Sequence, residues 1–186
     1  MPLPSNTYTL GPENGRMTVR TYREGMGSKV GHDLVLEVKQ WKGSANVDAD
    51  DPSKSSLTVT ADPRSFEVVE GKGGVKPLSD KDRRDILKNI EEKVFNVAKN
   101  PEITFNSTSV SGDATRATVT GNLTMAGQTH PVTVDVTAEE GADGSRFKAT
   151  IPVTQSQWGI KPYTAFLGAL KVRDTIEIDV EAKLSA

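Results

Sequence analysis

The chain has 186 residues, of which 35% are hydrophobic and 26% charged, and this length is most simply one domain over residues 1–186. Its formal net charge of −2 gives no general attraction to nucleic acid or to anionic membranes, so we expect no nucleic-acid partner. It has no cysteine, which excludes disulfides, thiol catalysis and thiolate metal sites.

The N-terminal stretch, MPLPSNTYTLGPENG, shows no basic region followed by an apolar run, which is the pattern of a secretory signal. No later window comes close to the roughly 18 continuous apolar residues of a membrane-spanning helix. We therefore expect no integral membrane segment and a cytoplasmic location.

Most of the chain alternates apolar and polar residues with a period of two, which is typical of β-strands with one buried face. The first such run is DLVLEVKQW (33–41), and turn sequences such as DADDPS and SGDA separate the later runs. Runs of about ten residues exceed the usual strand length and favour a tall antiparallel barrel over a compact sandwich. The later runs cover residues 57–62, 115–125, 130–136, 147–153 and 176–184.

One segment breaks the alternation and predicts a helix over about 79–99. Ser79 with Asp82 three residues later resembles a capping box, and Asn100-Pro101 is a stop signal. Ile86, Ile90 and Val94 recur at helical spacing between them. We expect this stripe to pack against the barrel, which makes the fold all-β with one helix.

Two histidines continue apolar strand faces and are candidates for a ligand contact. His32 extends the face of Leu34 and Leu36, and His130 extends the face of Val132. Imidazoles pointing into a lumen could bind a head group or act as an acid–base pair. The alternative for each is a histidine bonded to backbone at the barrel rim. Asp33 follows His32 but belongs to the opposite strand face, and we find no nucleophile or carboxylate partner within reach of either histidine, so we expect no catalytic residues.

A cluster of cations precedes and opens the predicted helix in VVEGKGGVKPLSDKDRRD (68–85). It is no phosphate-binding P-loop, because no Ser or Thr follows a Lys. Lys76, Arg83 and Arg84 could hold an anionic head group at a barrel mouth. Interleaved aspartates favour the alternative of a solvated loop and helix start. With two distant histidines and no cysteine, metal-ligand spacing is absent and no metal site is expected.

The segment WGIKPYTAFLGALKV (158–172) is apolar and aromatic but too interrupted by Gly and Pro to cross a bilayer. Tyr163, Phe166, Leu167 and Leu170 have the spacing of a short helix. The segment either closes a barrel end as packed core or forms a mouth loop that contacts a ligand.

Several segments resemble the YceI-like, polyisoprenoid-binding family. NPEITFNSTSV (100–110) and GNLTMAGQTHPVTVDV (121–136) are similar to its hallmark strands, and DRRDIL, VKQWKG and QSQWGIK are similar to its helix start and flanking strands. The resemblance implies an extended, eight-stranded antiparallel lipocalin-like β-barrel. Its apolar lumen would hold a long isoprenoid or similar amphiphile, and the protein would form a homodimer.

We therefore expect a non-catalytic carrier for a polyisoprenoid or isoprenoid quinone, with no cofactor apart from such a lipid. One alternative is an enzyme that uses His32 and His130 as an acid–base pair on a lipid or small molecule. Another is a structural or stress-response protein whose barrel is filled by side chains. The residues expected to contact the ligand are His32, Leu34, Leu36, Leu123, Met125, His130, Phe147, Ile151, Trp158, Tyr163, Phe166 and Leu167.

Overall fold

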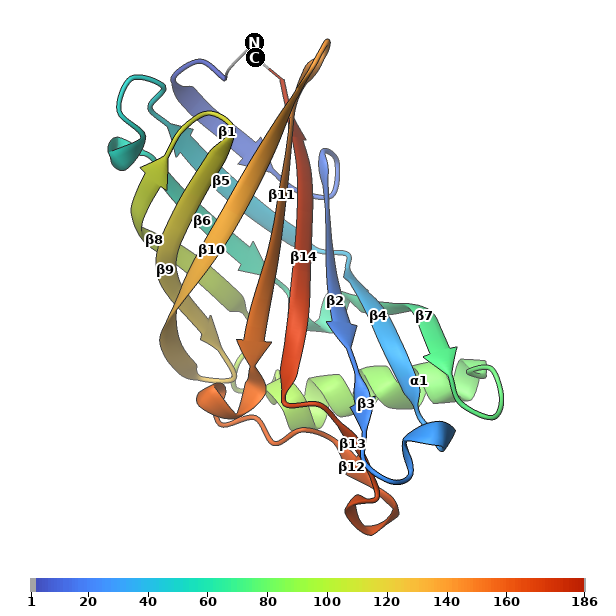
Figure 1. The fold of residues 1–186 in the computed structure, drawn as a ribbon. Helices are drawn as coiled ribbons and strands as arrows, with labels where there is room; N and C mark the ends of the chain where they lie inside the picture. Colours follow the sequence, from blue (N-terminus) through green and yellow to red (C-terminus); the bar gives the residue numbers. More distant parts are fainter. Residues whose placement is uncertain (1–2, 186) are drawn as a thin grey trace.

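The computed structural model describes residues 3–185 as a large antiparallel sheet that curls around an apolar interior (Figure 1). The runs predicted from alternation are confirmed as strands. The main sheet contains β1 (Asn6–Leu10), β2 (Gly15–Thr21), β4 (His32–Val38), β5 (Trp41–Val47), β6 (Ser56–Ala61), β7 (Phe66–Gly73), β8 (Ile103–Gly112), β9 (Arg116–Met125), β10 (Gln128–Gly141), β11 (Gly144–Thr154) and β14 (Thr175–Leu184).

These strands follow the order β1-β5-β6-β8-β9-β10-β11-β14-β2-β4-β7, and every pairing is antiparallel. The two ends of this order, β1 and β7, do not pair with each other among the described strands. The sheet is therefore curled and open at its edges, where the resemblance implied a closed barrel. A second sheet of three short strands contains β3 (Arg23–Glu24), β12 (Thr164–Ala165) and β13 (Leu170–Val172).

The main sheet has 11 strands where eight were expected, because three long runs of chain break in the middle. β1 and β2, β4 and β5, and β6 and β7 are each separated only by a short corner. Two of these corners bond to each other: the Lys39 N–H donates to the Ser65 carbonyl at 3.0 Å, and the Asp62 N–H donates to the Gln40 carbonyl at 3.0 Å. The alternation shifts by one residue at these corners: the buried positions pass from Val38 to Trp41 between β4 and β5, and from Ala61 to Phe66 between β6 and β7.

The helix α1 (Asp80–Asn89) begins as predicted. The Asp82 N–H donates to Ser79 Oγ at 3.1 Å, and the Ser79 N–H donates to the Asp82 carboxylate at 2.8 Å. A π-helical turn, η4 (Ile90–Phe95), continues it. The helix then ends at Asn96, with φ of 48°, and not at the predicted Asn100-Pro101. Asparagine adopts this left-handed conformation more readily than most residues, and it stops a helix as glycine does.

The helix packs against one end of the curled sheet, as its apolar stripe predicted. Ile90 and Phe95 are buried, and Ile86 and Val94 are partly buried against the same cluster. The rings of Phe66 and Phe95 stack with centroids 5.9 Å apart. We call this part of the interior the filled end; its buried side chains include Val38, Phe66, Phe95, Met125, Val153, Trp158 and Ile160. No helix within residues 3–185 is both long and apolar enough to span a membrane.

Candidate ligand-binding cavity

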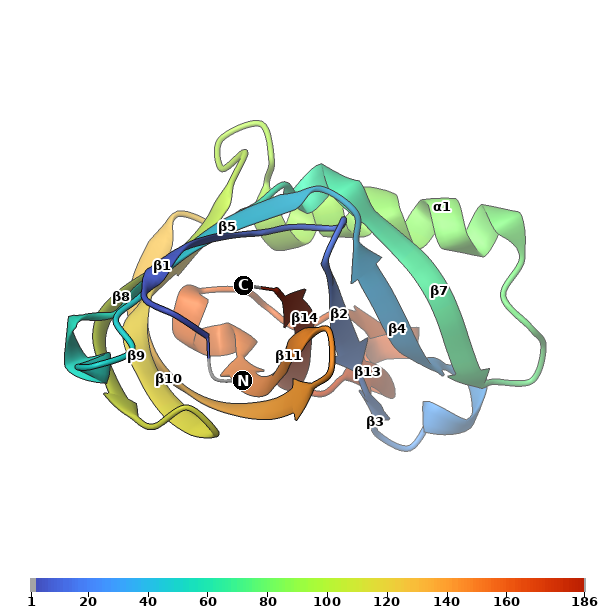
Figure 2. The same cartoon turned by 90° about the horizontal axis from the view of Figure 1, so that it is seen from above.

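An apolar cavity of about 370 Å³ lies inside the curled sheet, at the end where both chain termini lie and away from α1 (Figures 1 and 2). Residues of β1, β2, β5, β6, β8, β9, β10, β11 and β14 line it, and Leu3 lines it from the segment before β1. Figure 2 looks down into this ring of strands. The walls are almost entirely apolar and include Val59, Phe105, Val134, Phe147, Ile151 and Ile178.

Short inward-facing side chains form part of the cavity wall, beside larger ones such as Trp41, Phe105 and Phe147. β10 presents Val132, Val134 and Val136, and β11 presents Ala149, all of which are only half-buried although they face inward. At the filled end, side chains from η4 and from residues 158–160 pack against those of the strands and fill the interior. The curled sheet is therefore packed at one end and hollow at the other.

Gly121 on β9 lets one large ring lie against the wall. A Cβ at this position would lie 2.5 Å from the ring of Phe105, which is closer than any contact tolerates. With hydrogen at that position, Phe105 lies across β9 and still lines the cavity. The glycine thus widens the lumen at this level.

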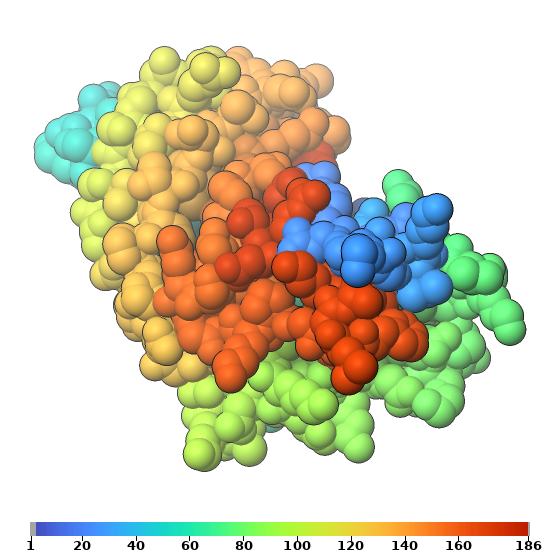
Figure 3. Space-filling view, turned by 60° about the horizontal axis from the view of Figure 1, so that its bottom comes forward, coloured from blue at the N-terminus to red at the C-terminus, as the bar shows by residue number. Residues whose placement is uncertain are grey.

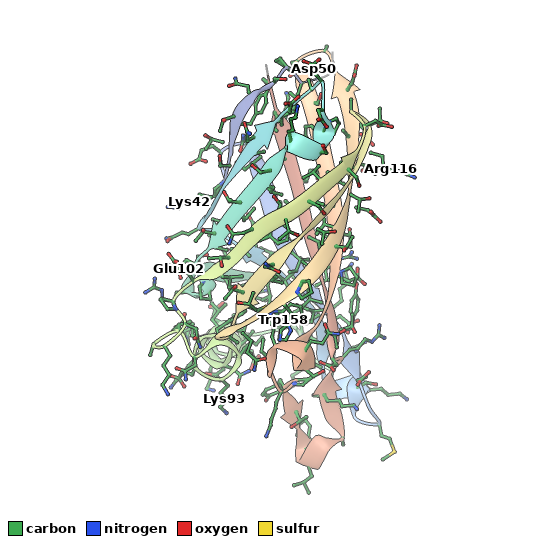
Figure 4. The ribbon with its side chains drawn as sticks, turned by 90° about the vertical axis from the view of Figure 1, so that its left-hand side faces the viewer. Lys42, Asp50, Lys93, Glu102, Arg116 and Trp158 are labelled. Carbon is green, nitrogen blue, oxygen red and sulfur yellow. The ribbon has the colours of Figure 1, made fainter. Side chains whose placement is uncertain are left out.

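Trp158 lies directly behind the closed end of the cavity. Its side chain is 1% exposed, and its Nε1–H donates to the carbonyl of Leu123 at 3.0 Å. The side chain of Leu123 lines the cavity, so this bond joins the wall to the filled end. The ring of His130 meets Trp158 edge-on, with centroids 5.2 Å apart. Figure 4 shows Trp158 in the lower half of the molecule, with Asp50 at the opposite end.

Polar residues line the outer end of the cavity, which we call the cavity mouth: Asn46, Asp48, Ser55 and Asp113. Asp48 accepts the N–H groups of Asp50 and Asp51, at 3.1 and 2.8 Å. The Thr115 hydroxyl, helped by the N–H groups of Thr115 and Arg116, holds the pKa of Asp113 below its usual value. This carboxylate is therefore ionised at neutral pH. The mouth can hold the polar end of an amphiphile while the interior holds its apolar part.

Three of the predicted contact residues line the cavity: Leu123, Phe147 and Ile151. The other nine do not. Leu36, Met125 and Trp158 are buried in the core, and Leu34 packs partly buried against it. Alternation placed Leu34, Leu36 and Met125 correctly on inward faces, but it did not predict how deep along the interior each one lies.

The two histidines do not form a pair. His32 Nε2 lies 2.8 Å from the carbonyl oxygen of Lys76, whereas His130 contacts Trp158 and lies 3.2 Å from the Gln128 side chain. Their strands, β4 and β10, are not neighbours in the sheet. The two imidazoles therefore do not form the acid–base pair that the enzyme alternative requires. His32 agrees with the other alternative, a histidine hydrogen-bonded to backbone. Within residues 3–185 no three His, Asp or Glu side chains gather as a metal site would require.

The cations proposed for a head group lie at the helix-bearing end, away from the cavity mouth. Arg83 Nη1 donates to the carbonyl of Val68 at 2.5 Å. Lys76 and Arg84 are exposed beside and on α1. Their placement favours the alternative of a solvated loop and helix start.

The segment 158–172 divides into a buried and an exposed half. Trp158 and Ile160 are packed in the core, so this half is a plug. The second half forms β12 and β13, which pair beside β3 at the surface shown in Figure 3. Phe166 and Leu167 have φ of 50° and 55°, which rules out the predicted short helix. Tyr163, Phe166 and Leu167 are 49%, 69% and 109% exposed and do not line the cavity.

Because of this placement, we expect Phe166→Asp to leave ligand binding unchanged. The exposed ring lies outside the cavity, so a charge there removes no contact with a bound molecule. A fluorescence titration with the neutral apolar probe N-phenyl-1-naphthylamine should give dissociation constants within about twofold of each other. A loss of tenfold or more would place this loop in the binding site after all.

Residues that sequence reasoning missed make up most of the cavity wall. They include Met17, Trp41, Val132, Val134 and Val180. The available signal was the small size of inward residues on successive strands, Val-x-Val-x-Val on β10 and Ala149 on β11. Such a run of short side chains on one face indicates a wall around a space.

Comparison with known proteins gives one family. A family model described as the YceI-like domain matches residues 8–184. Relatives named Protein YceI, from Salmonella arizonae and Salmonella newport, are each 33% identical over 97 residues. This match covers 52% of the chain and 44% of each relative, so it spans less than half of their length.

Solved structures with a similar fold carry little sequence identity. The crystal structure of Burkholderia cenocepacia BcnA has a TM-score of 0.67 at 19% identity, covering 92% of this chain and 96% of that one. The Campylobacter jejuni YceI protein has a TM-score of 0.63 at 17% identity, covering 81% and 84%. At these identities the likeness concerns the fold alone.

Proposed function

The chain belongs to the YceI-like domain family, and on that premise we propose that it is a non-catalytic binding or carrier protein for an amphipathic lipid. The sequence resemblance implies a polyisoprenoid or an isoprenoid quinone as the ligand class. The apolar part would lie in the cavity and the polar end at the cavity mouth.

The open apolar cavity supports this proposal more than any other observation. Protein interiors usually contain few voids larger than a water molecule. A space of about 370 Å³ with apolar walls falls within the usual range of small-molecule sites. Each buried methylene group of a ligand contributes about 0.8 kcal/mol, so affinity needs no further polar site.

The same observation argues against the two alternatives. A barrel filled by side chains would not leave half-buried valines around an open space. An enzyme needs convergent polar groups at the ligand, whereas Asp48 and Asp113 at the mouth already accept backbone N–H groups of their own turns.

Two measurements on the purified protein test the proposal. We expect organic extracts to contain a reproducible lipid by denaturing mass spectrometry, and N-phenyl-1-naphthylamine to bind saturably with enhanced fluorescence. Empty extracts together with no saturable probe signal would reject the carrier function. A cytoplasmic location, a single domain and a homodimer stay predictions of the sequence.

A further inference from the structure

We propose that the end of the molecule opposite the cavity mouth docks on the surface of an anionic lipid bilayer, with apolar side chains inserted and lysines on the head groups. Docking of this kind goes beyond the proposed function and does not depend on what the cavity holds. The docking surface consists of two loops, 25–30 and 166–169, which we call the tip. Figure 1 places both loops at the bottom of the molecule, away from both chain termini.

The two loops of the tip are joined to each other. The Gly27 N–H donates to the Ala169 carbonyl at 2.8 Å, and the strands that lead into the loops, β3 and β13, pair directly. A Cβ at Gly25 would lie 2.3 Å from the Ala169 carbonyl oxygen, so this close approach requires the glycine. Figure 3 shows the two segments side by side. Side chains from both loops therefore belong to one surface.

Three large apolar side chains project from the tip: Met26, Phe166 and Leu167. Met26 is 96% exposed, and Leu167 on the other loop is fully exposed. Single apolar side chains scattered over a surface need no explanation, but several gathered at one exposed place mark a contact with a protein or a membrane. The tip is therefore a contact surface.

The backbone of the second loop is strained where it presents these side chains. Phe166 and Leu167 are consecutive residues in the left-handed region, with φ of 50° and 55°. This conformation is unfavourable for residues with a Cβ, other than asparagine and aspartate. Both side chains are exposed, so core packing does not offset the strain. Strain of this kind clusters at binding sites, and here the strained turn holds two apolar side chains in water.

Cations surround the tip although acidic residues are in excess over the chain as a whole. Residues 23–31 and 161–173 contain five cations and one acidic residue, whereas the whole chain has 23 cations and 25 acidic residues. Three of the five have an acidic partner within 4.0 Å. Lys29 and Lys161 are exposed and make no ion pair within residues 3–185. Unpaired cations beside apolar side chains are complementary to anionic head groups above an apolar bilayer interior.

A second copy of this chain fits the tip less well than a bilayer does. A symmetric dimer places the same surface of both copies face to face, so Lys29 and Lys161 of one copy would meet those of the other. Projecting side chains also need a matching hollow in a rigid partner, whereas a fluid bilayer adapts its shape to them. Charge and shape therefore both favour the bilayer.

Co-sedimentation of the full chain with vesicles tests the proposal. We expect saturable binding to vesicles of phosphatidylcholine and phosphatidylglycerol in equal parts, and at least about tenfold weaker binding to phosphatidylcholine alone. Added salt should weaken the binding, because it screens the charges. Failure to sediment with the anionic vesicles would overturn the proposal. Self-association that Leu167→Asn abolishes, without vesicle binding, would assign the tip to a second copy instead.

A substitution at Leu167 tests the apolar contact. Leu167→Asn removes the apolar side chain and suits the left-handed backbone better, so the protein should unfold at the native temperature or above it. We expect vesicle affinity to fall at least about tenfold. Leu167→Met keeps an apolar side chain and is the matched control, with affinity within about threefold of the native protein. Equal affinity in the two variants would overturn the insertion of the tip.

A pair of lysine substitutions tests the charge contact. Lys29→Gln combined with Lys161→Gln should lower the affinity for anionic vesicles at least about tenfold, because each cation near such a surface contributes roughly fivefold. Lys42→Gln removes an exposed cation on β5, away from the tip in Figure 4, and should leave the affinity unchanged. An equal loss in Lys42→Gln would mean that charge acts without regard to position and would overturn docking through the tip.

Discussion

Val134→Asp is expected to weaken the binding of an apolar ligand by at least about a hundredfold, or about 2.7 kcal/mol. Val134 lies on β10, opposite Val119 in the sheet, and both line the cavity. In the free protein the new carboxylate is hydrated through the open mouth. An apolar ligand would strip that water without replacing its hydrogen bonds, and an uncompensated buried charge costs several kcal/mol.

The neighbouring residue provides the control. Thr133 is exposed on the outer face of the same strand, so Thr133→Asp introduces the same charge one position away. Titration with N-phenyl-1-naphthylamine at neutral pH should show full affinity in Thr133→Asp and little or none in Val134→Asp. Both variants should keep a native circular dichroism spectrum. Full probe affinity in a folded Val134→Asp would mean that ligands bind elsewhere.

Much of the fold could be predicted from local patterns, because alternation and capping are local properties. The strand runs and the Ser79 start of α1 needed only their own residues. The corner that splits β4 from β5 was missed: the alternation shifts by one residue between Val38 and Trp41, but the bonds that form the corner join it to Ser65 and Asp62, far along the chain. The helix end was misplaced because Asn96 stops the helix before the proline signal.

The sequence predicted which side chains point into the interior, but not how far along the interior each one lies. A period of two shows which side chains point inward, and Leu36 and Ile151 both do. It does not show that Leu36 lies at the filled end and Ile151 beside the cavity. That difference depends on which side chains meet across the interior, and large residues from η4 and the 158–160 segment fill one end only.

Trp158 shows the same limit in one residue. Its aromatic segment stood out in the sequence, but its partner is the Leu123 carbonyl, 35 residues earlier. Only the assembled sheet brings the two together. The sequence therefore left open whether the segment is packed core or a mouth loop that contacts a ligand.

Trp158→Ala is expected to destabilise the protein by about 3–5 kcal/mol, because it removes a fully buried indole from a packed core. For a chain of this length that corresponds to a fall in Tm of roughly 6–20 °C. Thermal unfolding followed by circular dichroism measures it. Tyr163→Ala, which truncates an aromatic ring that is 49% exposed in the same segment, is the control and should change the unfolding free energy by no more than about 0.5 kcal/mol.

Trp158→Phe separates packing from hydrogen bonding at the same position. It keeps an aromatic ring in the core but leaves the Leu123 carbonyl without its 3.0 Å donor, a loss that costs about 1–3 kcal/mol. The order of stability should therefore be native, Trp158→Phe, Trp158→Ala. If Trp158→Ala unfolded at the same temperature as the native protein, the packing of the indole would not stabilise the filled end. If Trp158→Phe were as stable as the native protein and Trp158→Ala were less stable, packing alone would account for the stabilisation by Trp158. The hydrogen bond to Leu123 would then contribute nothing measurable.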